Sequence, residues 1–145
     1  MVFKRIKQLR IKHNLSQKEI SEKLNVKRST YAGWELGTNT IPLRKLYLLS
    51  NYYKYSIDYI TGLSKINNFE YSSNNIKLEV IGNNLRLLRK KSNLTQKDVA
   101  TFLGIATSTY TLYELGTILI PTAYIYKIAK KLNYSIDLIL KNNYN

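Results

Sequence analysis

Apolar residues recur at spacings of three and four along much of the chain, which is the period of an α-helix with one buried face. Ile20 and Leu24 give such a face to residues 17–24. Ser16, with Glu19 three residues later, matches the capping-box pattern, in which side chains and backbone donors satisfy each other. The pattern therefore predicts a short helix that begins directly after Ser16.

A second short helix is predicted over residues 28–36, where Tyr31 and Trp34 recur at helical spacing and face inward. Asn25 stands between the two helices, and asparagine tolerates the left-handed backbone that a sharp turn requires. Two short helices joined by a tight turn form a helix-turn-helix. The side chains left on the outward face are Lys27, Arg28, Ser29, Ala32 and Gly33.

The whole arrangement occurs twice, because a shift of 79 positions aligns the chain with itself without a gap. About 23 of the 60 positions from 2 to 61 are identical in the second copy, among them Gln17 with Gln96 and Tyr31 with Tyr110. The chain is therefore an internal duplication. The helices expected are residues 3–13, 17–24, 28–36, 43–53 and 57–61 in the first copy, and 81–92, 96–103, 107–115, 122–132 and 136–140 in the second.

These elements predict an all-α fold of two tandem five-helix helix-turn-helix domains joined by a linker. Domain one is expected to cover residues 1–63 and domain two residues 80–145. Residues 64–79 form the expected linker, because the stretch from 64 to 75 is rich in Ser and Asn and has no amphipathic period. Fully extended, residues 64–80 span about 50 Å.

The net charge of the chain indicates which class of molecule it binds. Twenty-three Lys and Arg against nine Asp and Glu give a formal charge of +14, which favours nucleic acid first and an anionic membrane second. Cysteine is absent and His13 is the single histidine, so neither a metal site nor a cofactor site is expected. No catalytic constellation is present, so we do not expect an enzyme. No apolar run is long enough to span a bilayer, so we expect a cytoplasmic protein without a membrane partner.

Particular motifs resemble one family. Ser16-Gln17 at a helix start, Asn25-Val26 at the turn, Ser29-Thr30-Tyr31 in the second motif helix and Glu35-Leu36-Gly37 after it occur together. The sequence resembles the phage repressor and Cro type of helix-turn-helix, the XRE family. The resemblance implies a sequence-specific transcription regulator of a bacterium or phage that binds double-stranded DNA with its third helix in the major groove. It implies a repressor in particular, with an activator as the alternative, because activators share this scaffold.

The resemblance also implies which residues meet base edges. In domain one the family's contact positions hold Lys27, Arg28 and Ser29. In domain two the matching positions hold Thr107 and Ser108. A fourth family position, one turn later, is Gly33 and can make no side-chain contact. Readout would therefore depend on Arg28, whose guanidinium can pair with guanine for about 1–3 kcal/mol of discrimination.

Other positions are candidates for contacts with DNA phosphates or for ion pairs within each domain. The family uses a glutamine at the start of the first motif helix to hold a phosphate oxygen, which implies this role for Gln17 and Gln96. The alternative is that each is a solvent-facing glutamine without a partner on DNA. The other candidates are Thr38, Arg44 and Lys45, each of which has the alternative of being a solvated surface residue. The resemblance implies two internal ion pairs, Arg10 with Glu35 and Arg89 with Glu114.

Domain two departs from this pattern at the recognition site. It has no Lys or Arg from Gly104 to Tyr126. An exposed apolar patch often marks a protein interface, so domain two is expected to bind DNA weakly or to form a homodimer. The alternative is that Ile118 and Leu119 fold onto the core of their own domain. The candidate interface residues are Leu112, Ile118, Leu119 and Tyr124.

A second class of function remains open. The family also includes antitoxin-like and anti-repressor modules, in which a helix-turn-helix domain binds protein. Phosphate contacts release counterions and weaken steeply with salt, whereas apolar interfaces do not, so the salt dependence of binding distinguishes the two classes.

Overall fold

A computed structural model describes residues 1–70 and 75–142 of the chain. These residues form ten α-helices and no strand, and the chain divides into two compact units, Met1–Ser72 and Ser73–Asn145. The predicted all-α class, with two tandem five-helix helix-turn-helix domains, is confirmed. We keep the names domain one and domain two for the two units.

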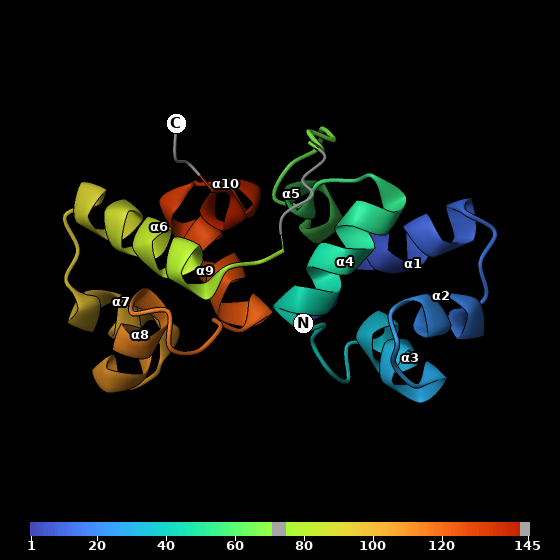
Figure 1. The fold of residues 1–145 in the computed structure, drawn as a ribbon, viewed down its shortest axis with the longest axis horizontal. Coiled ribbons are helices and arrows are strands. Elements are labelled where there is room, and N and C mark those ends of the chain that lie inside the picture. Colours follow the sequence, from blue (N-terminus) through green and yellow to red (C-terminus); the bar gives the residue numbers. More distant parts are fainter. Residues whose placement is uncertain (71–74, 143–145) are drawn as a thin grey trace. The chain divides into compact units, whose positions relative to one another are not determined.

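Domain one contains five short helices (Figure 1): α1 Lys4–Lys12, α2 Gln17–Lys23, α3 Arg28–Leu36, α4 Leu43–Tyr53 and α5 Ile57–Thr61. Local chemistry fixes several of their starts. Ser16 and Glu19 form the predicted capping box of α2, and the side chain of Ser56 accepts a hydrogen bond from the Tyr59 amide at the start of α5. Helix bounds differ from the predicted ones by one residue at each end of α1 and at the end of α2.

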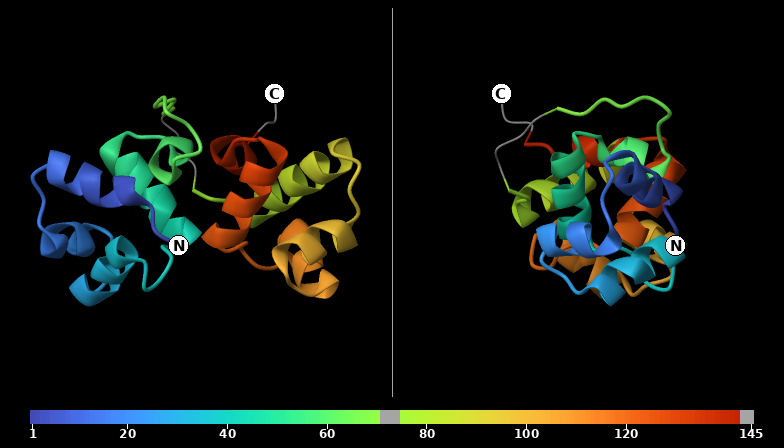
Figure 2. Two further views of the ribbon diagram at one scale, coloured as in Figure 1. Left: turned by 180° about the vertical axis from the view of Figure 1, so that it is seen from behind. Right: turned by 90° about the vertical axis from the view of Figure 1, so that its right-hand side faces the viewer.

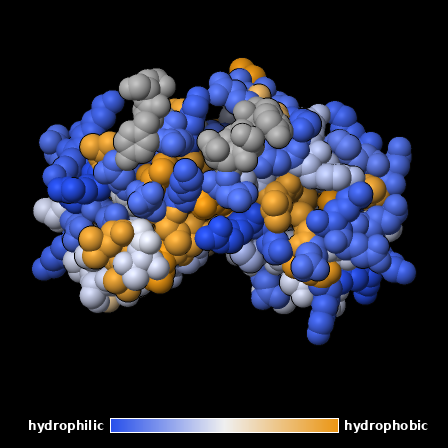
Figure 3. Space-filling view, viewed as in Figure 1, coloured by the Kyte–Doolittle hydropathy of each residue, from blue (hydrophilic) through white to orange (hydrophobic). Residues whose placement is uncertain are grey.

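Apolar side chains on one face of each helix form the core of domain one. Ile6 of α1, Ile20 of α2 and Tyr31 of α3 are fully buried. Leu46 and Leu49 of α4 complete the core. On the surface, hydrophilic residues cover much of the face that Figure 3 shows. Within the domain, α2 and α3 pack on each other at one end, and α5 packs on α1 and α4 at the other (Figures 1 and 2). The helix-turn-helix therefore has one buried side and one open side.

Domain two repeats the arrangement with α6 Leu78–Lys91, α7 Gln96–Leu103, α8 Thr107–Glu114, α9 Thr122–Leu132 and α10 Ile136–Leu140. The turn positions also correspond, because Asn25 (φ 56°) and Gly104 (φ 73°) both adopt the left-handed backbone. Helix α6 is the largest departure from prediction, since it begins three residues before the expected Ile81. Its extra turn buries Val80 against the domain.

The first residues of the predicted linker are fixed to domain one. A guanidinium nitrogen of Arg5 donates to the Ser64 carbonyl at 2.7 Å. The Asn67 side chain accepts from the Ser56 amide at 2.9 Å and donates to the Lys54 carbonyl at 3.0 Å. The full 50 Å span expected from the sequence is therefore not available. Residues 71–74 of the predicted linker lie outside the described residues.

Candidate nucleic-acid interface

The open side of α3 presents the predicted base-contacting residues of domain one. Lys27 occupies the N-cap position and its side chain makes no capping hydrogen bond. Arg28 and Ser29 follow in the first turn, and all three residues are exposed. An exposed first turn can enter a major groove and bring these side chains to base edges.

The Arg28 side chain is hydrogen-bonded to a neighbouring side chain on this surface. Its guanidinium donates a hydrogen bond of 2.9 Å to the side-chain oxygen of Gln17 on α2. The amide nitrogen of Gln17 donates in turn to a Glu35 carboxylate oxygen at 3.2 Å. The Gln17 side chain therefore lies between Arg28 and Glu35. A contact from Gln17 to phosphate remains a prediction.

Glu35 belongs to an internal ion pair with Arg10 of α1. The Arg10 Nε atom lies 2.6 Å from Glu35 Oε1, and the side chains are 13% and 3% exposed. This hydrogen bond raises the pKa of Arg10 above its ordinary value, outweighing the opposite effect of burial. Arg10 also donates to the Leu15 carbonyl at 2.9 Å. The pair joins α1 to α3 beneath the candidate interface.

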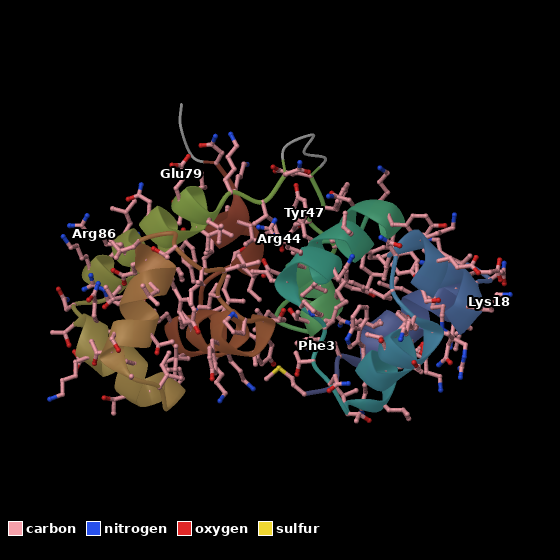
Figure 4. All side chains as sticks on the ribbon, turned by 60° about the horizontal axis from the view of Figure 1, so that its bottom comes forward. Phe3, Lys18, Arg44, Tyr47, Glu79 and Arg86 are labelled. Carbon is pink, nitrogen blue, oxygen red and sulfur yellow. The ribbon has the colours of Figure 1, made fainter. Side chains whose placement is uncertain are left out.

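The predicted phosphate contacts of domain one lie in two environments. Thr38 is exposed after α3, and Arg44 is exposed on α4 (Figure 4). Lys45 is half-buried, and its ammonium donates to the Leu24 carbonyl at the end of α2 at 2.8 Å. Lys45 therefore already binds a helix C-terminus, where a cation is favourable.

Gly33 corrects one expectation. It was expected to face outward, but it is buried. The loop after α3 covers it: the Gly33 carbonyl accepts from the Asn39 amide at 3.3 Å, and a Cβ atom on Gly33 would lie 3.3 Å from the Asn39 side chain. Helical period alone could not show this, because the loop comes from outside the helix.

Domain two keeps the internal ion pair. Arg89 Nε lies 2.6 Å from Glu114 Oε2, and Gln96 donates to Glu114 Oε1 at 3.0 Å. Burial would raise the pKa of Glu114, but hydrogen bonds from Arg89, Gln96 and Tyr110 outweigh it, so the pKa is lowered.

The outer part of this network differs between the domains. The Gln96 oxygen accepts from the Thr111 hydroxyl at 2.9 Å, whereas its counterpart on Gln17 accepts from Arg28. Thr107 and Ser108 are exposed in the first turn of α8. Domain two thus presents hydroxyl groups where domain one presents a guanidinium.

The candidate interface residues of domain two fall into two groups. Leu112 is 37% exposed and Ile118 is 41% exposed. Leu119 and Tyr124 are half-buried, and the Tyr124 ring packs 6.4 Å from the Tyr113 ring. Sequence reasoning missed Leu115, which is 68% exposed at the end of α8. The equivalent Leu36 of domain one is 77% exposed as well, and a leucine that recurs in both copies gives no signal in the sequence that it lies outside the core.

Two other features are absent from residues 1–70 and 75–142. No group of three or more His, Cys, Asp and Glu side chains there could hold a metal ion. Within the same residues, no helix has both the length and the apolar character needed to cross a membrane.

Comparison with known proteins identifies the family. The helix-turn-helix family profile matches residues 6–60 and 85–139. Two curated relatives from Bacillus subtilis (strain 168) are the uncharacterized HTH-type transcriptional regulators YobD, 39% identical over 64 residues, and YqaE, 39% identical over 62 residues. These matches cover 44% and 43% of this chain and 57% and 53% of the relatives, so the chain spans about half the length of the curated relatives it matches. No solved structure matches it. The chain therefore belongs to the XRE-type helix-turn-helix family of DNA-binding regulators and carries two copies of the family domain in tandem.

Proposed function

We propose that this protein is a sequence-specific, double-stranded DNA-binding transcription regulator that reads the major groove with α3 of domain one. The observation that carries the proposal is the position of Arg28. Its guanidinium is exposed in the first turn of α3 and is held by Gln17, which is anchored through Glu35 to the half-buried Arg10. A guanidinium fixed in this way loses less conformational freedom when it pairs with guanine.

Charge supplies the remaining affinity. The chain carries a formal charge of +14, and Lys27, Thr38 and Arg44 lie exposed beside α3 or on α4. Phosphate contacts of this kind position a protein on DNA and release counterions. Gln17 has two amide N–H donors, so one can donate to a phosphate oxygen while the other holds Glu35. Lys45 contributes as well if DNA binding displaces it from the Leu24 carbonyl.

We assign repression rather than activation. A protein bound at a promoter excludes other proteins from the same DNA, so repression requires occupancy alone, whereas activation requires a second contact with the transcription machinery. The resemblance to phage repressors supports this assignment. The corresponding division of the chain is a DNA-reading domain at residues 1–63, a linker at 64–79 and a second domain at 80–145, acting in the cytoplasm.

Selection of random-sequence duplex DNA tests the proposal. Wild-type protein should enrich one motif, and Arg28→Ala should lose preference at one guanine, equivalent to about 1–3 kcal/mol. Gln17→Ala should weaken the same preference. The matched control is Arg86→Ala, which removes an exposed arginine of α6 in domain two (Figure 4) and should leave the motif unchanged. Failure to enrich any motif, or an unchanged motif with Arg28→Ala, would contradict the proposal.

The second candidate function is a protein-interaction or antitoxin-like module. The exposed Leu112, Leu115 and Ile118 of domain two favour it. Binding that survives a rise in salt from about 0.05 to 0.2 M would support this function, because binding through six or more phosphate contacts falls by about a thousandfold or more over that range.

A further inference from the structure

Domain two contains an apolar cavity of about 270 Å³ where α7 packs against α9 (Figure 1). The apolar part of its lining comes from α7, α9 and the loop before α7: Leu94, Val99, Phe102, Ile128 and Leu132. Asp98 and Lys131 line it as well, and both residues are exposed, so their charged groups lie at its opening. We call it the α7–α9 cavity. None of these residues belongs to the candidate nucleic-acid interface.

The internal duplication shows why this cavity is open. The positions equivalent to Ser92 and Leu132 hold His13 and Tyr53 in domain one. The Tyr53 side chain is buried, and its ring centre lies 4.5 Å from that of His13. Domain two therefore has two fewer rings beside the same pair of helices. The smaller side chains leave unfilled volume between α7 and α9.

An unfilled apolar cavity is favourable to a ligand of the right size. Side chains that line a void lose dispersion contacts on one side, and a ligand that restores them stabilises the folded domain. A cavity of about 150 Å³ lined by apolar side chains is large enough to bind benzene. The α7–α9 cavity can therefore hold a single ring, or a branched chain of similar size, together with a short polar arm.

The charges at the opening favour a negatively charged arm. The Lys131 ammonium lies 5.3 Å from the centre of the Phe102 ring, and within residues 1–70 and 75–142 no carboxylate pairs with it. Asp98 is different, because its carboxylate already accepts from the Thr95 amide at 2.9 Å and is followed in charge by the adjacent Lys97. The uncompensated charge at the opening is therefore positive, and the chain's formal charge of +14 attracts anions further.

We propose that the α7–α9 cavity binds a small apolar carboxylate, whose ring or branched chain fills the cavity while its carboxylate pairs with Lys131. A protein partner fits this site less well. Stable interfaces bury about 800 Å² on each partner, whereas the exposed residues Lys97 and Lys130 adjoin the lining and interrupt the apolar surface. The site does not depend on DNA binding.

Nuclear magnetic resonance of the isotope-labelled full chain, without DNA and at about 0.05 M salt, tests the proposal. Phenylacetate is the probe, because it has one ring and a short acidic arm. Phenylacetamide is its neutral match, and phenethylammonium is the cationic one. Phenylacetate should shift the amide signals of α7 and α9 with a dissociation constant of about 1 mM. It should bind about three- to fivefold more tightly than phenylacetamide. The signals of α2 and α4 in domain one should not move.

Two variants locate the ring and the carboxylate. Leu132→Tyr introduces the side chain that domain one has at this position, and it should weaken phenylacetate binding about tenfold or more, because a packed interior has no room for both rings. Its matched control is Leu138→Tyr, the same change at a leucine of α10 that is 43% exposed and does not line the cavity, which should bind as the wild type does. Lys131→Gln should reduce the affinity for phenylacetate to that for phenylacetamide.

Several results would overturn the proposal. The absence of shifts in α7 and α9 up to about 20 mM phenylacetate would do so, as would equal binding of phenylacetamide or tighter binding of phenethylammonium. Equal losses from Leu132→Tyr and Leu138→Tyr would place the ligand elsewhere. Circular dichroism checks that each variant remains folded, and if Leu132→Tyr does not, the wild-type shifts and Lys131→Gln still decide the outcome.

Discussion

Glu114 accepts hydrogen bonds from Arg89 at 2.6 and 3.0 Å and from Gln96 at 3.0 Å, and its side chain is 3% exposed. Its pKa is lowered from the ordinary 4.5, since these bonds outweigh the opposing effect of burial. A lowered pKa in the folded state means that the ionised carboxylate stabilises domain two above about pH 4.5. This contribution is lost as the pH falls through the lower, folded-state value.

Glu114→Gln should therefore lower the free energy of unfolding of domain two at pH 7 by about 3 kcal/mol. It should also reduce the further loss of stability between about pH 5 and pH 3, because the amide does not titrate. Urea unfolding by circular dichroism measures both effects. Fluorescence of Trp34, the single tryptophan, reports on domain one and should not change. An unaltered acid dependence in the variant would show that other carboxylates, such as Asp98, dominate.

The sequence predicted which residues belong to these ion-pair networks better than it predicted which of them contact each other. The resemblance implied Arg10 with Glu35, and the structure contains that pair. It did not imply that Gln17 joins Glu35 to Arg28, because a contact across two helices depends on how the helices cross. Only the structure shows that the hydroxyl of Thr111 binds the equivalent glutamine, Gln96.

Among the helices, bounds were predicted best where capping chemistry marks them. Ser56 and Ser135 cap α5 and α10 through backbone amides three residues on, and both helices begin and end as predicted. Helix α6 begins three residues before its predicted start, because Lys77 makes no side-chain cap and the pattern gave no start signal. Its first turn instead lies against the end of α8, where a Cβ atom on Gly116 would be 2.9 Å from the Glu79 Cα, and α6 packs on α8.

Gly82 allows this packing. A Cβ atom there would lie 2.4 Å from the Glu114 carbonyl oxygen and 2.7 Å from that of Tyr113, both of which are backbone atoms. Gly82→Ala should therefore force α6 away from α8 and destabilise domain two by about 1–3 kcal/mol. Thermal unfolding by circular dichroism measures the change.

Gly33→Ala is the matched control, because its Cβ would lie at an ordinary 3.9 Å from the Thr38 Cβ and would come close only to the end of the Asn39 side chain, at 3.3 Å. That side chain can move, and alanine favours a helix over glycine by about 1 kcal/mol. We expect domain one to be unchanged or stabilised by up to that amount, as measured by Trp34 fluorescence. Equal destabilisation by the two substitutions would show that the close approach of α6 to α8 is not the reason why Gly82→Ala destabilises domain two.

At the scale of the whole molecule, the described residues form two units with separate cores and separate ion pairs. Each unit has fewer than 75 residues, a size at which one buried ion pair is a large part of the total stability. If the units unfold independently, damage to one should leave the other intact.

Arg10→Met tests this independence, because it leaves Glu35 buried without its arginine, at a cost of about 3–5 kcal/mol. In a domain of this size such a loss lowers the melting temperature by about 15 °C or more. Trp34 fluorescence should show this shift, while about half of the helical signal keeps the wild-type transition. Arg89→Met should do the reverse, shifting the rest of the helical signal and leaving the Trp34 transition in place. If Arg89→Met moved the Trp34 transition by the same amount, the two units would unfold as one, and the duplication would have produced a single cooperative protein.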